Sequence, residues 1–346
     1  MTCSRSVETP ITARLKRLFS LKFMPAMKSR IRNAAIALAT LVIGPAALGA
    51  TYVLPENGDS VIGEIQYIET RYEDTLLDLG RRYGIGYEEI VAANPGVDAW
   101  VPGAGTRVVI PSRFILPDAP REGIVVNLPE HRLYYFPKPK AGEPAVVQTY
   151  PVSVGKMDWK TPLGVTRITD KRARPTWYPP ESVRAEHAAQ GRYLARAVPP
   201  GPNNPLGEYA MRLGIPGGAY LIHGTNQPRG VGMQVTHGCI RMFPEDIEFL
   251  FPQVPVQTPV RILHQPSKMG WQDGTLFLEV HGALKGEENP EPQSLTDLTR
   301  ALVAVTQDRV IQLDWASAEQ VFLKASGIPE PIVQEPVIAQ SETPVH

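Results

Sequence analysis

The sequence predicts a mainly β protein with attached helices, preceded by a small α+β module in which two helices lie between two strands. Three observations support this prediction. Proline accounts for 35 of the 346 residues, which favours long loops over a helical bundle. Short apolar runs rich in β-branched and aromatic residues recur between residues 121 and 280, as in strands. Between residues 65 and 112, two amphipathic helical patterns stand between two strand-like runs.

Residues 1–50 have the features of an export signal. Basic residues precede an apolar run from Ala34 to Ala50, and small residues end that run, which is the order of a secretory signal. The run is short for a membrane-spanning helix and contains a Gly-Pro pair, so we favour a cleaved signal over a retained anchor. Because the basic region lies far from the first residue, Met24 or Met27 is a candidate for the true start.

The net charge of zero hides an uneven distribution of charge. Residues 1–50 hold eight basic residues and one acid, so the rest of the chain has 27 basic and 34 acidic residues. The resulting net charge of −7 gives no electrostatic basis for binding nucleic acid. We therefore expect no nucleic-acid partner.

Residues 51–64 are expected to be a linker, and residues 65–113 a compact βααβ module. Capping and stop signals flank its two helical patterns and set their limits. The predicted elements are a strand at Gln66–Ile68, a helix capped by Asp74 and ended by Gly84, a helix that starts near Glu88 and ends at Asn94, and a strand at Arg107–Ile110.

The larger domain is expected at residues 121–266, with a C-terminal hairpin at 267–283 that turns at Asp273 and Gly274. Residues 174–217 are expected to be irregular except for a helix at 182–190, and loops of this size are usually functional. The predicted strands are Ile124–Leu128, Leu133–Phe136, Val146–Val154, Val165–Ile168, Ala219–His223 and Val260–Leu263.

Residues 284–346 form the predicted C-terminal extension. Short helices are expected at Leu295–Val303 and Ala316–Lys324, where apolar residues recur at helical spacing. Residues 327–346 are rich in proline and polar residues, so they are expected to be disordered.

One thiol and two histidines are the candidate reactive groups. Cys3 precedes the predicted cleavage site, so Cys239 is the single cysteine of the exported chain and has no disulfide partner. A cysteine attacks as its thiolate, and a nearby histidine can take its proton. Both His223, at the end of an apolar strand, and His237 are available for this. Taken alone, Cys239 is more commonly a buried inert thiol, and His223 a histidine of the hydrophobic core. Their combination favours a nucleophilic site.

The residues around the thiol suit acyl transfer. Gly238 lets the backbone approach a substrate closely, and amide groups there can bind a developing oxyanion. Arg241 offers a planar fork suited to a carboxylate, with a surface ion pair as the alternative role. Thr225 and Asn226 are alternatively simple turn residues. With one cysteine and no tight histidine spacing, a zinc site is not expected.

Two motifs resemble the signature of the L,D-transpeptidase catalytic domain (YkuD type). They are His223-Gly224-Thr225-Asn226 and Thr236-His237-Gly238-Cys239-Ile240-Arg241-Met242. Three upstream segments resemble the Gram-negative branch that carries a lysin motif (LysM): Pro175-Thr176-Trp177, Arg184-Ala185-Glu186-His187 and the run from Pro200 to Gly207. Residues 65–113 are similar to a LysM at Asp74-Thr75-Leu76, Arg82-Tyr83-Gly84-Ile85 and Val108-Val109-Ile110-Pro111, although Glu73 stands where glycine is usual.

This resemblance implies a β-sandwich-like catalytic domain behind a LysM module, and it assigns roles to the site residues. Cys239 would be the acyl-accepting nucleophile and His223 the general base. The other implied roles are base orientation by the Gly224 carbonyl, a second site histidine at His237, an oxyanion hole at the Gly238 and Cys239 amides, and substrate binding by Arg241, Thr236, Thr225 and Asn226. Many members carry Asn in place of Arg241, and Ser is commoner than Thr236.

The implied reaction takes place in the periplasm, needs no cofactor or metal, and has peptidoglycan glycan and stem peptides as partners. Cys239 would displace the terminal D-alanine of a stem tetrapeptide and hold the remainder as a thioester. A diaminopimelate amine (giving a 3→3 cross-link), a lysine of an outer-membrane lipoprotein or a free D-amino acid would then resolve it. The alternatives are a carboxypeptidase that uses water and a peptidoglycan-binding protein with a dead site.

Overall fold

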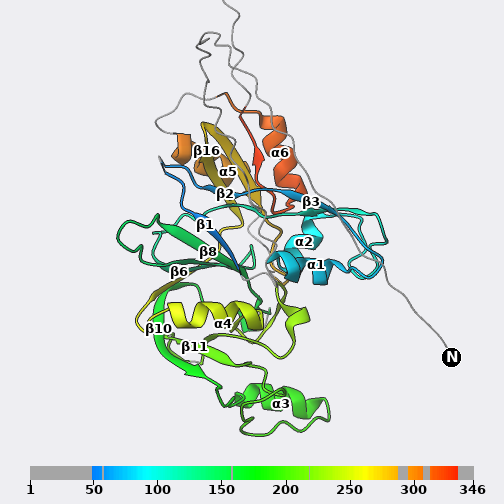
Figure 1. The fold of residues 1–346 in the computed structure, drawn as a ribbon, viewed down its shortest axis with the longest axis vertical. Helices are drawn as coiled ribbons and strands as arrows, with labels where there is room; N and C mark the ends of the chain where they lie inside the picture. Colours follow the sequence, from blue (N-terminus) through cyan, green and yellow to red (C-terminus); the bar gives the residue numbers. More distant parts are fainter. Residues whose placement is uncertain are drawn as a thin grey trace, which may run out of the picture. The chain divides into compact units, whose positions relative to one another are not determined.

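The computed structural model describes residues 49–56, 58–156, 159–217, 219–286, 295–306 and 312–333, all within one compact unit (Figure 1). The predicted signal therefore lies outside the described residues except for its last two positions. In the ranges that the structure describes, no helix is long and apolar enough to cross a membrane.

The protein is mostly β, as predicted, and its main component is a nine-stranded sheet. Neighbouring strands are antiparallel except for two parallel pairs, β6–β15 and β12–β14. The order across the sheet is β1 (Ala50–Val53), β8 (Val146–Pro151), β7 (Arg132–Phe136), β6 (Gly123–Asn127), β15 (Pro259–Leu263), β10 (Gly164–Ala173), β11 (Tyr209–Leu213), β12 (Leu221–His223) and β14 (Ile240–Arg241). The short strands β9 (Val154–Gly155) and β13 (Gln234–Thr236) form a separate parallel pair.

The module has the predicted strand–helix–helix–strand order. It consists of β3 (Gln66–Glu69), α1 (Leu76–Tyr83), α2 (Tyr87–Ala93) and β4 (Arg107–Ile110), with β3 and β4 antiparallel. Gly84 ends α1 in the left-handed conformation, as expected. The capping residue is Thr75 rather than Asp74, because the Asp78 amide donates to the Thr75 hydroxyl at 3.0 Å. Asp74 lies one residue too early for this role and accepts from the Arg71 amide instead.

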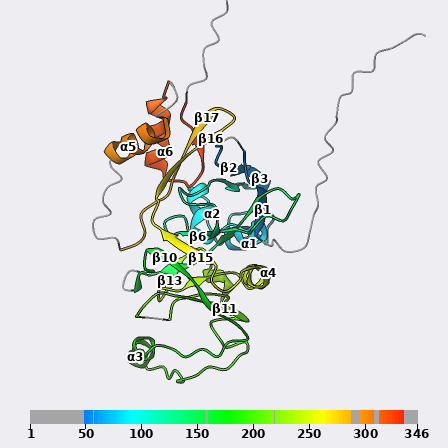
Figure 2. The ribbon, with the colours of Figure 1, turned by 90° about the vertical axis from the view of Figure 1, so that its left-hand side faces the viewer.

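The main sheet separates two hydrophobic cores, because successive side chains of a strand point to opposite faces. Ile124 and Val126 of β6 belong to the core that includes residues of α4 (Pro244–Gln253). Val125, between them, belongs to the core that includes Leu79 of α1 and Ile90 of α2. The module and α4 therefore pack against different faces of β6 (Figure 2).

Residues 51–64 do not form the expected linker. Strand β1 pairs with β8 at the edge of the main sheet, and β2 (Val61–Gly63) pairs with β5 (Arg113–Ile115). Val61 and Ile62 are buried. These strands are only three or four residues long, so no apolar periodicity marks them in the sequence.

The predicted C-terminal hairpin is present as β16 (Ser267–Gln272) and β17 (Thr275–Val280), but it does not belong to the main sheet. Its third strand is β18 (Glu330–Pro331), a position expected to be disordered. Helices α5 (Leu295–Thr306) and α6 (Trp315–Lys324) share a core with the hairpin, so the extension is folded around it. The last residues of the predicted disordered tail, 334–346, lie outside the described part of the chain.

The long segment at 174–217 is less irregular than expected. It contains α3 (Glu181–Ala189), close to its predicted position, but it also contributes β11 to the main sheet. Residues 174–208, which are irregular except for α3, are called the cavity loop. Helix α4 was not predicted, because two prolines fall within its ten residues and obscure its apolar face.

Candidate active site

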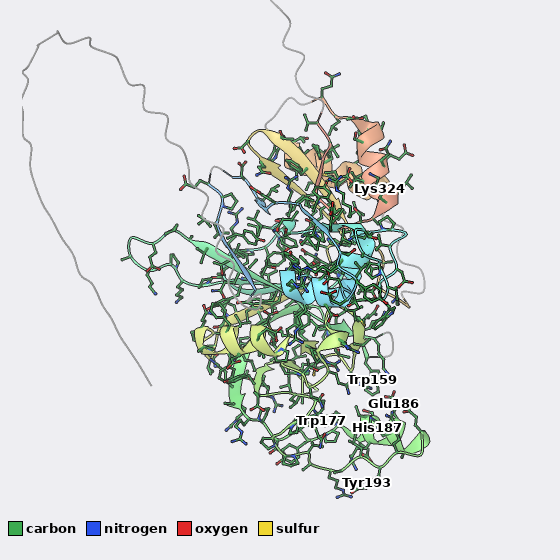
Figure 3. All side chains as sticks on the ribbon, turned by 45° about the vertical axis from the view of Figure 1, so that its right-hand side comes forward. Trp159, Trp177, Glu186, His187, Tyr193 and Lys324 are labelled. Carbon is green, nitrogen blue, oxygen red and sulfur yellow. The ribbon has the colours of Figure 1, made fainter. Side chains whose placement is uncertain are left out.

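A cavity of about 490 Å³ lies between the cavity loop and strands β10, β11, β12 and β14. Trp177, from the quoted segment Pro175-Thr176-Trp177, and Trp159, which sequence reasoning did not single out, line this cavity. Both side chains are labelled in Figure 3. The predicted site residues that line the cavity are Cys239, His223, His237, Arg241 and Thr236. Residues from both motifs and from the cavity loop therefore meet around one space.

The parallel pairing of β12 and β14 brings the two motifs together. Ile222 lies opposite Ile240, and both side chains are fully buried, which fixes the register. His223 lies opposite Arg241 in the same register. Cys239 directly precedes β14, and the Leu221 amide of β12 lowers the pKa of its thiol. Cys239 thus lies just before the start of β14, and His223 lies at the end of the neighbouring parallel strand β12.

The Cys239 thiol is partly buried, and its sulfur lies 3.6 Å from the Ala219 carbonyl oxygen, to which it can donate. Burial raises the pKa of Cys239 above its ordinary value, while the Leu221 amide and the Arg241 charge act in the opposite direction. The net rise means that the resting group at neutral pH is a thiol. A base must therefore remove its proton when it reacts.

His223 is buried and lines the same cavity as the thiol, so it is the candidate for this base. Its Nδ1 lies 2.6 Å from the Gly224 carbonyl oxygen, which only accepts, so Nδ1 carries the hydrogen. Burial lowers the pKa of His223 to about 3, and the nearby Arg241 charge adds to this effect. At neutral pH the ring is uncharged, so it can accept a proton.

Gly238 and Thr236 hold the turn that presents the thiol. Gly238 has φ +92°, and a Cβ there would lie 2.9 Å from the Tyr220 ring, so no other residue fits without strain. The Thr236 hydroxyl donates to the Cys239 carbonyl oxygen at 2.6 Å. This bond closes the turn that carries the thiol, and the role of the Gly238 and Cys239 amides as an oxyanion hole stays a prediction.

The Arg241 guanidinium lines this cavity, and not all of its N–H groups have hydrogen-bond acceptors. Its Nε is buried and forms no hydrogen bond, and burial lowers the pKa of its guanidinium. A buried cation of this kind is stabilised by an anion such as a carboxylate. The predicted role in substrate binding is consistent with this position.

The remaining predicted residues have contacts outside the cavity lining. The Gln227 amide donates to the Thr225 hydroxyl at 2.9 Å, and the Asn226 amide group donates to the Pro202 carbonyl at 3.1 Å. Gly224 donates its amide to the Tyr209 carbonyl. The structure thus gives Thr225 and Asn226 turn and loop contacts, and their predicted contact with substrate stays a prediction.

His237 contacts a residue that sequence reasoning did not place in the site. Its Nε2 lies 2.8 Å from Oε2 of Glu186, which comes from α3 in the cavity loop. Lys156 Nζ lies 3.1 Å from the other carboxylate oxygen. On another side, the Trp159 ring meets the His237 ring edge-on, with 5.2 Å between centroids. The one available sequence signal for Glu186 was the Arg184-Ala185-Glu186-His187 segment.

Among the described residues, one group of side chains has the spacing of metal ligands: Glu130, Glu279 and His281. Lys268 Nζ lies between the two carboxylates, 2.9 Å from Glu130 and 2.7 Å from Glu279. The ammonium thus takes the place of a metal ion, and none of these residues lines the cavity. This group is a buried ion-pair cluster.

Comparison with known proteins agrees with this geometry. Residues 121–262 match the YkuD family, described as the L,D-transpeptidase catalytic domain. The chain is 39% identical over 307 residues to the probable L,D-transpeptidase YcfS of Escherichia coli K12, covering 88% of this chain and 94% of that protein. It is 37% identical to YbiS of the same strain (85% and 96% covered) and 36% identical to ErfK/SrfK of Salmonella typhimurium (88% and 94% covered). The similarity therefore extends well beyond the matched domain.

Proposed function

This chain belongs to the L,D-transpeptidase family of cysteine-based acyltransferases, and we propose that it transfers peptidoglycan stem peptides through Cys239. The observation that carries the proposal is the meeting of a thiol, a neutral imidazole and a buried guanidinium in one cavity. A thiol with an adjacent base is the nucleophile of an acyl transfer. The guanidinium of Arg241 suits a carboxylate of the peptide.

In the first half-reaction, Nε2 of His223 takes the proton of the thiol while the sulfur attacks the carbonyl carbon of the third stem residue. The carbonyl oxygen becomes an oxyanion that accepts from the amides of Gly238 and Cys239. The carbon–nitrogen bond then breaks, and the amine of the terminal D-alanine leaves with the proton from His223. The acyl group remains on Cys239 as a thioester.

In the second half-reaction, an acceptor amine attacks the thioester carbon and gives a proton to His223. The carbon–sulfur bond breaks, and the Cys239 sulfur recovers that proton from the imidazole. The acceptor is a diaminopimelate side chain or a lysine of an outer-membrane lipoprotein. Water in place of the amine would make the protein a carboxypeptidase.

We further propose that residues 65–113 are a LysM module that binds glycan, and that residues 1–50 direct the chain to the periplasm. The strand–helix–helix–strand order and the motif residues support the first proposal, and the order of basic, apolar and small residues supports the second. A module on the glycan raises the local concentration of stem peptides. Co-sedimentation of the Cys239→Ala protein with peptidoglycan sacculi tests the binding, and no sedimentation would favour a purely structural module.

To test the activity, the purified protein is incubated with disaccharide-tetrapeptide and the masses of the products are measured by mass spectrometry. The Cys239→Ala variant is treated in the same way as the control. A dimer that has lost one alanine, absent in the variant, is the expected product. Tripeptide alone would indicate hydrolysis or a missing acceptor, and a lysine-bearing peptide separates the two. Unchanged substrate in both samples would favour a peptidoglycan-binding protein with a dead site.

A further inference from the structure

Glu186 reaches His237 from a distant part of the chain. It lies on α3, 51 residues before His237, and its carboxylate is the hydrogen-bond partner of Nε2 at 2.8 Å. Trp159, labelled with Glu186 in Figure 3, packs edge-on against the same His237 ring. His237 is thus held between a carboxylate from the cavity loop and an indole ring from the loop after β9.

The charges of this contact define which ring nitrogen carries hydrogen. Hydrogen bonds from His237 and Lys156 lower the pKa of Glu186 to about 2, so the carboxylate is ionised at neutral pH. An ionised carboxylate only accepts hydrogen bonds. Nε2 of His237 must therefore be a donor, which leaves Nδ1 as the nitrogen with a lone pair in the neutral ring.

The contact also joins two parts of the cavity wall. His237 lies two residues before the nucleophile, in the turn that Gly238 and Thr236 shape. Glu186 belongs to α3 in the cavity loop, and Lys156, directly after β9, contacts the same carboxylate. Three separate segments therefore meet at one carboxylate.

We propose that Glu186 is a positioning residue that fixes His237 in the Nε2–H tautomer and holds α3 against the turn that carries Cys239. The proposal rests on the proposed transferase function, and it assigns to Glu186 no contact with substrate. A histidine whose ring is held by a carboxylate in one tautomer and orientation keeps the turn beside it in one geometry, without reorganisation when the thiol reacts.

The test measures the His237 tautomer by long-range ¹H–¹⁵N NMR in the full-length protein and in Glu186→Ala and Glu186→Gln. Wild type is expected to show the Nε2–H form, and Glu186→Ala to lose it, while Gln retains it in part because its carbonyl also accepts. Glu181→Gln, an exposed change on the same helix, is the matched control and should leave the tautomer unchanged. An unchanged tautomer in Glu186→Ala would overturn the proposal. This readout decides the proposal even if the protein does not turn over the tetrapeptide.

A double-mutant cycle with His237→Ala provides the kinetic test. Glu186→Ala is expected to lower kcat about tenfold or more, with KM changed by less than about threefold, because the change loosens the turn that presents the Cys239 thiol and leaves the predicted substrate-binding residues in place. In the His237→Ala background the same change should cost little further, since Glu186 acts through that ring. Losses that multiply across the cycle would show that Glu186 acts independently, which would also overturn the proposal.

Discussion

The Arg132 guanidinium holds the Glu89 carboxylate in a buried bidentate ion pair, with Nε–Oε1 at 2.7 Å and Nη2–Oε2 at 2.9 Å. Glu89 belongs to α2 of the module, and Arg132 begins β7 of the main sheet. Arg132 also donates a hydrogen bond to the Gly84 carbonyl at the end of α1. Its guanidinium carbon lies over the Phe114 ring, 4.1 Å from the ring centroid. A buried, desolvated ion pair therefore connects the module to the main sheet.

Removal of one partner of this pair should be strongly destabilising. Arg132→Leu is expected to lower the free energy of unfolding by about 3–5 kcal/mol, because it leaves the Glu89 carboxylate buried and unpaired. The double variant Glu89→Leu/Arg132→Leu should lose less than Arg132→Leu alone. Urea unfolding followed by circular dichroism measures both.

The more exposed ion pair between Arg81 and Glu245, with Nε–Oε1 at 2.7 Å, is the matched control for that experiment. Arg81→Leu is expected to cost about 1 kcal/mol or less, because water screens a pair at the surface. Equal losses in Arg132→Leu and Arg81→Leu would contradict the importance of burial for the Arg132 pair.

Much of the site was accessible from the sequence because its chemistry is local. Cys239 and His237 are two residues apart, and His223 ends an apolar strand that had to lie in the core. The contact between Glu186 and His237 was not accessible. It depends on how the cavity loop folds back over 51 residues, and no local pattern encodes that path.

The fold shows the same division between local and long-range information. Strands such as β6 and β7, with continuous apolar runs, were predicted within about a residue. Strands β1, β2 and β13 were missed, since three or four residues carry no readable alternation. The pairing of β18 with the C-terminal hairpin was missed because a two-residue strand with a proline has no strand signature.

Asp246 should make stability depend on pH. It is buried in α4, its Oδ2 has no partner, and burial raises its pKa to about 8. A carboxyl group whose pKa is higher in the folded state favours folding below about pH 4, and this contribution is lost as pH rises through about 8. The free energy of unfolding should therefore fall as the pH rises from about 4 to about 8.

Asp246→Asn tests this dependence, because the amide keeps the acceptor for the Gly49 amide and cannot ionise. At pH 9 the variant is expected to be more stable than wild type, on the order of 2 kcal/mol, the cost of a poorly paired buried group. At pH 4, the lower limit of this window, the two should differ little. Urea unfolding at both pH values measures the difference, and a constant difference would contradict a buried titration.

The reactivity of Cys239 should follow a single ionisation at high pH. Because burial raises the pKa of the thiol and His223 is uncharged, no thiolate–imidazolium pair is expected near neutral pH. The rate of alkylation by iodoacetamide should rise continuously from pH 7 to above pH 9. A rate plateau between pH 5 and 7 would instead indicate a preformed thiolate.

The Arg241 charge lowers the pKa of Cys239, so Arg241→Met should raise that pKa and slow alkylation at pH 8. The loss is expected to be about threefold to tenfold, as for a shift of up to about one pKa unit. Arg229→Met, an exposed charge outside the cavity lining, should leave the rate unchanged. Equal rates in Arg241→Met and wild type would show that the guanidinium does not act on the sulfur.

Gly232 lets the loop before the catalytic turn lie directly against the module. It has φ +83°, and a Cβ there would lie 2.4 Å from the Cα of Gly86. The Glu88 amide of α2 donates to the Gly232 carbonyl at 3.1 Å. Two backbones therefore meet here without a side chain between them, two residues before β13.

Gly232→Ala should accordingly displace this loop as well as strain it. Gly105, with φ +76° and no atom within reach of a Cβ, isolates the strain of the left-handed conformation alone. Gly105→Ala is expected to cost about 1 kcal/mol, and Gly232→Ala about 1–3 kcal/mol more, because the backbone of Gly86 cannot move away freely. Gly232→Ala should also slow acylation of Cys239 by a carbapenem, measured as the mass increase with time, while Gly105→Ala leaves that rate unchanged. Equal stability of the two variants would mean that the loop yields without cost, and the module would then give the catalytic turn no support through this contact.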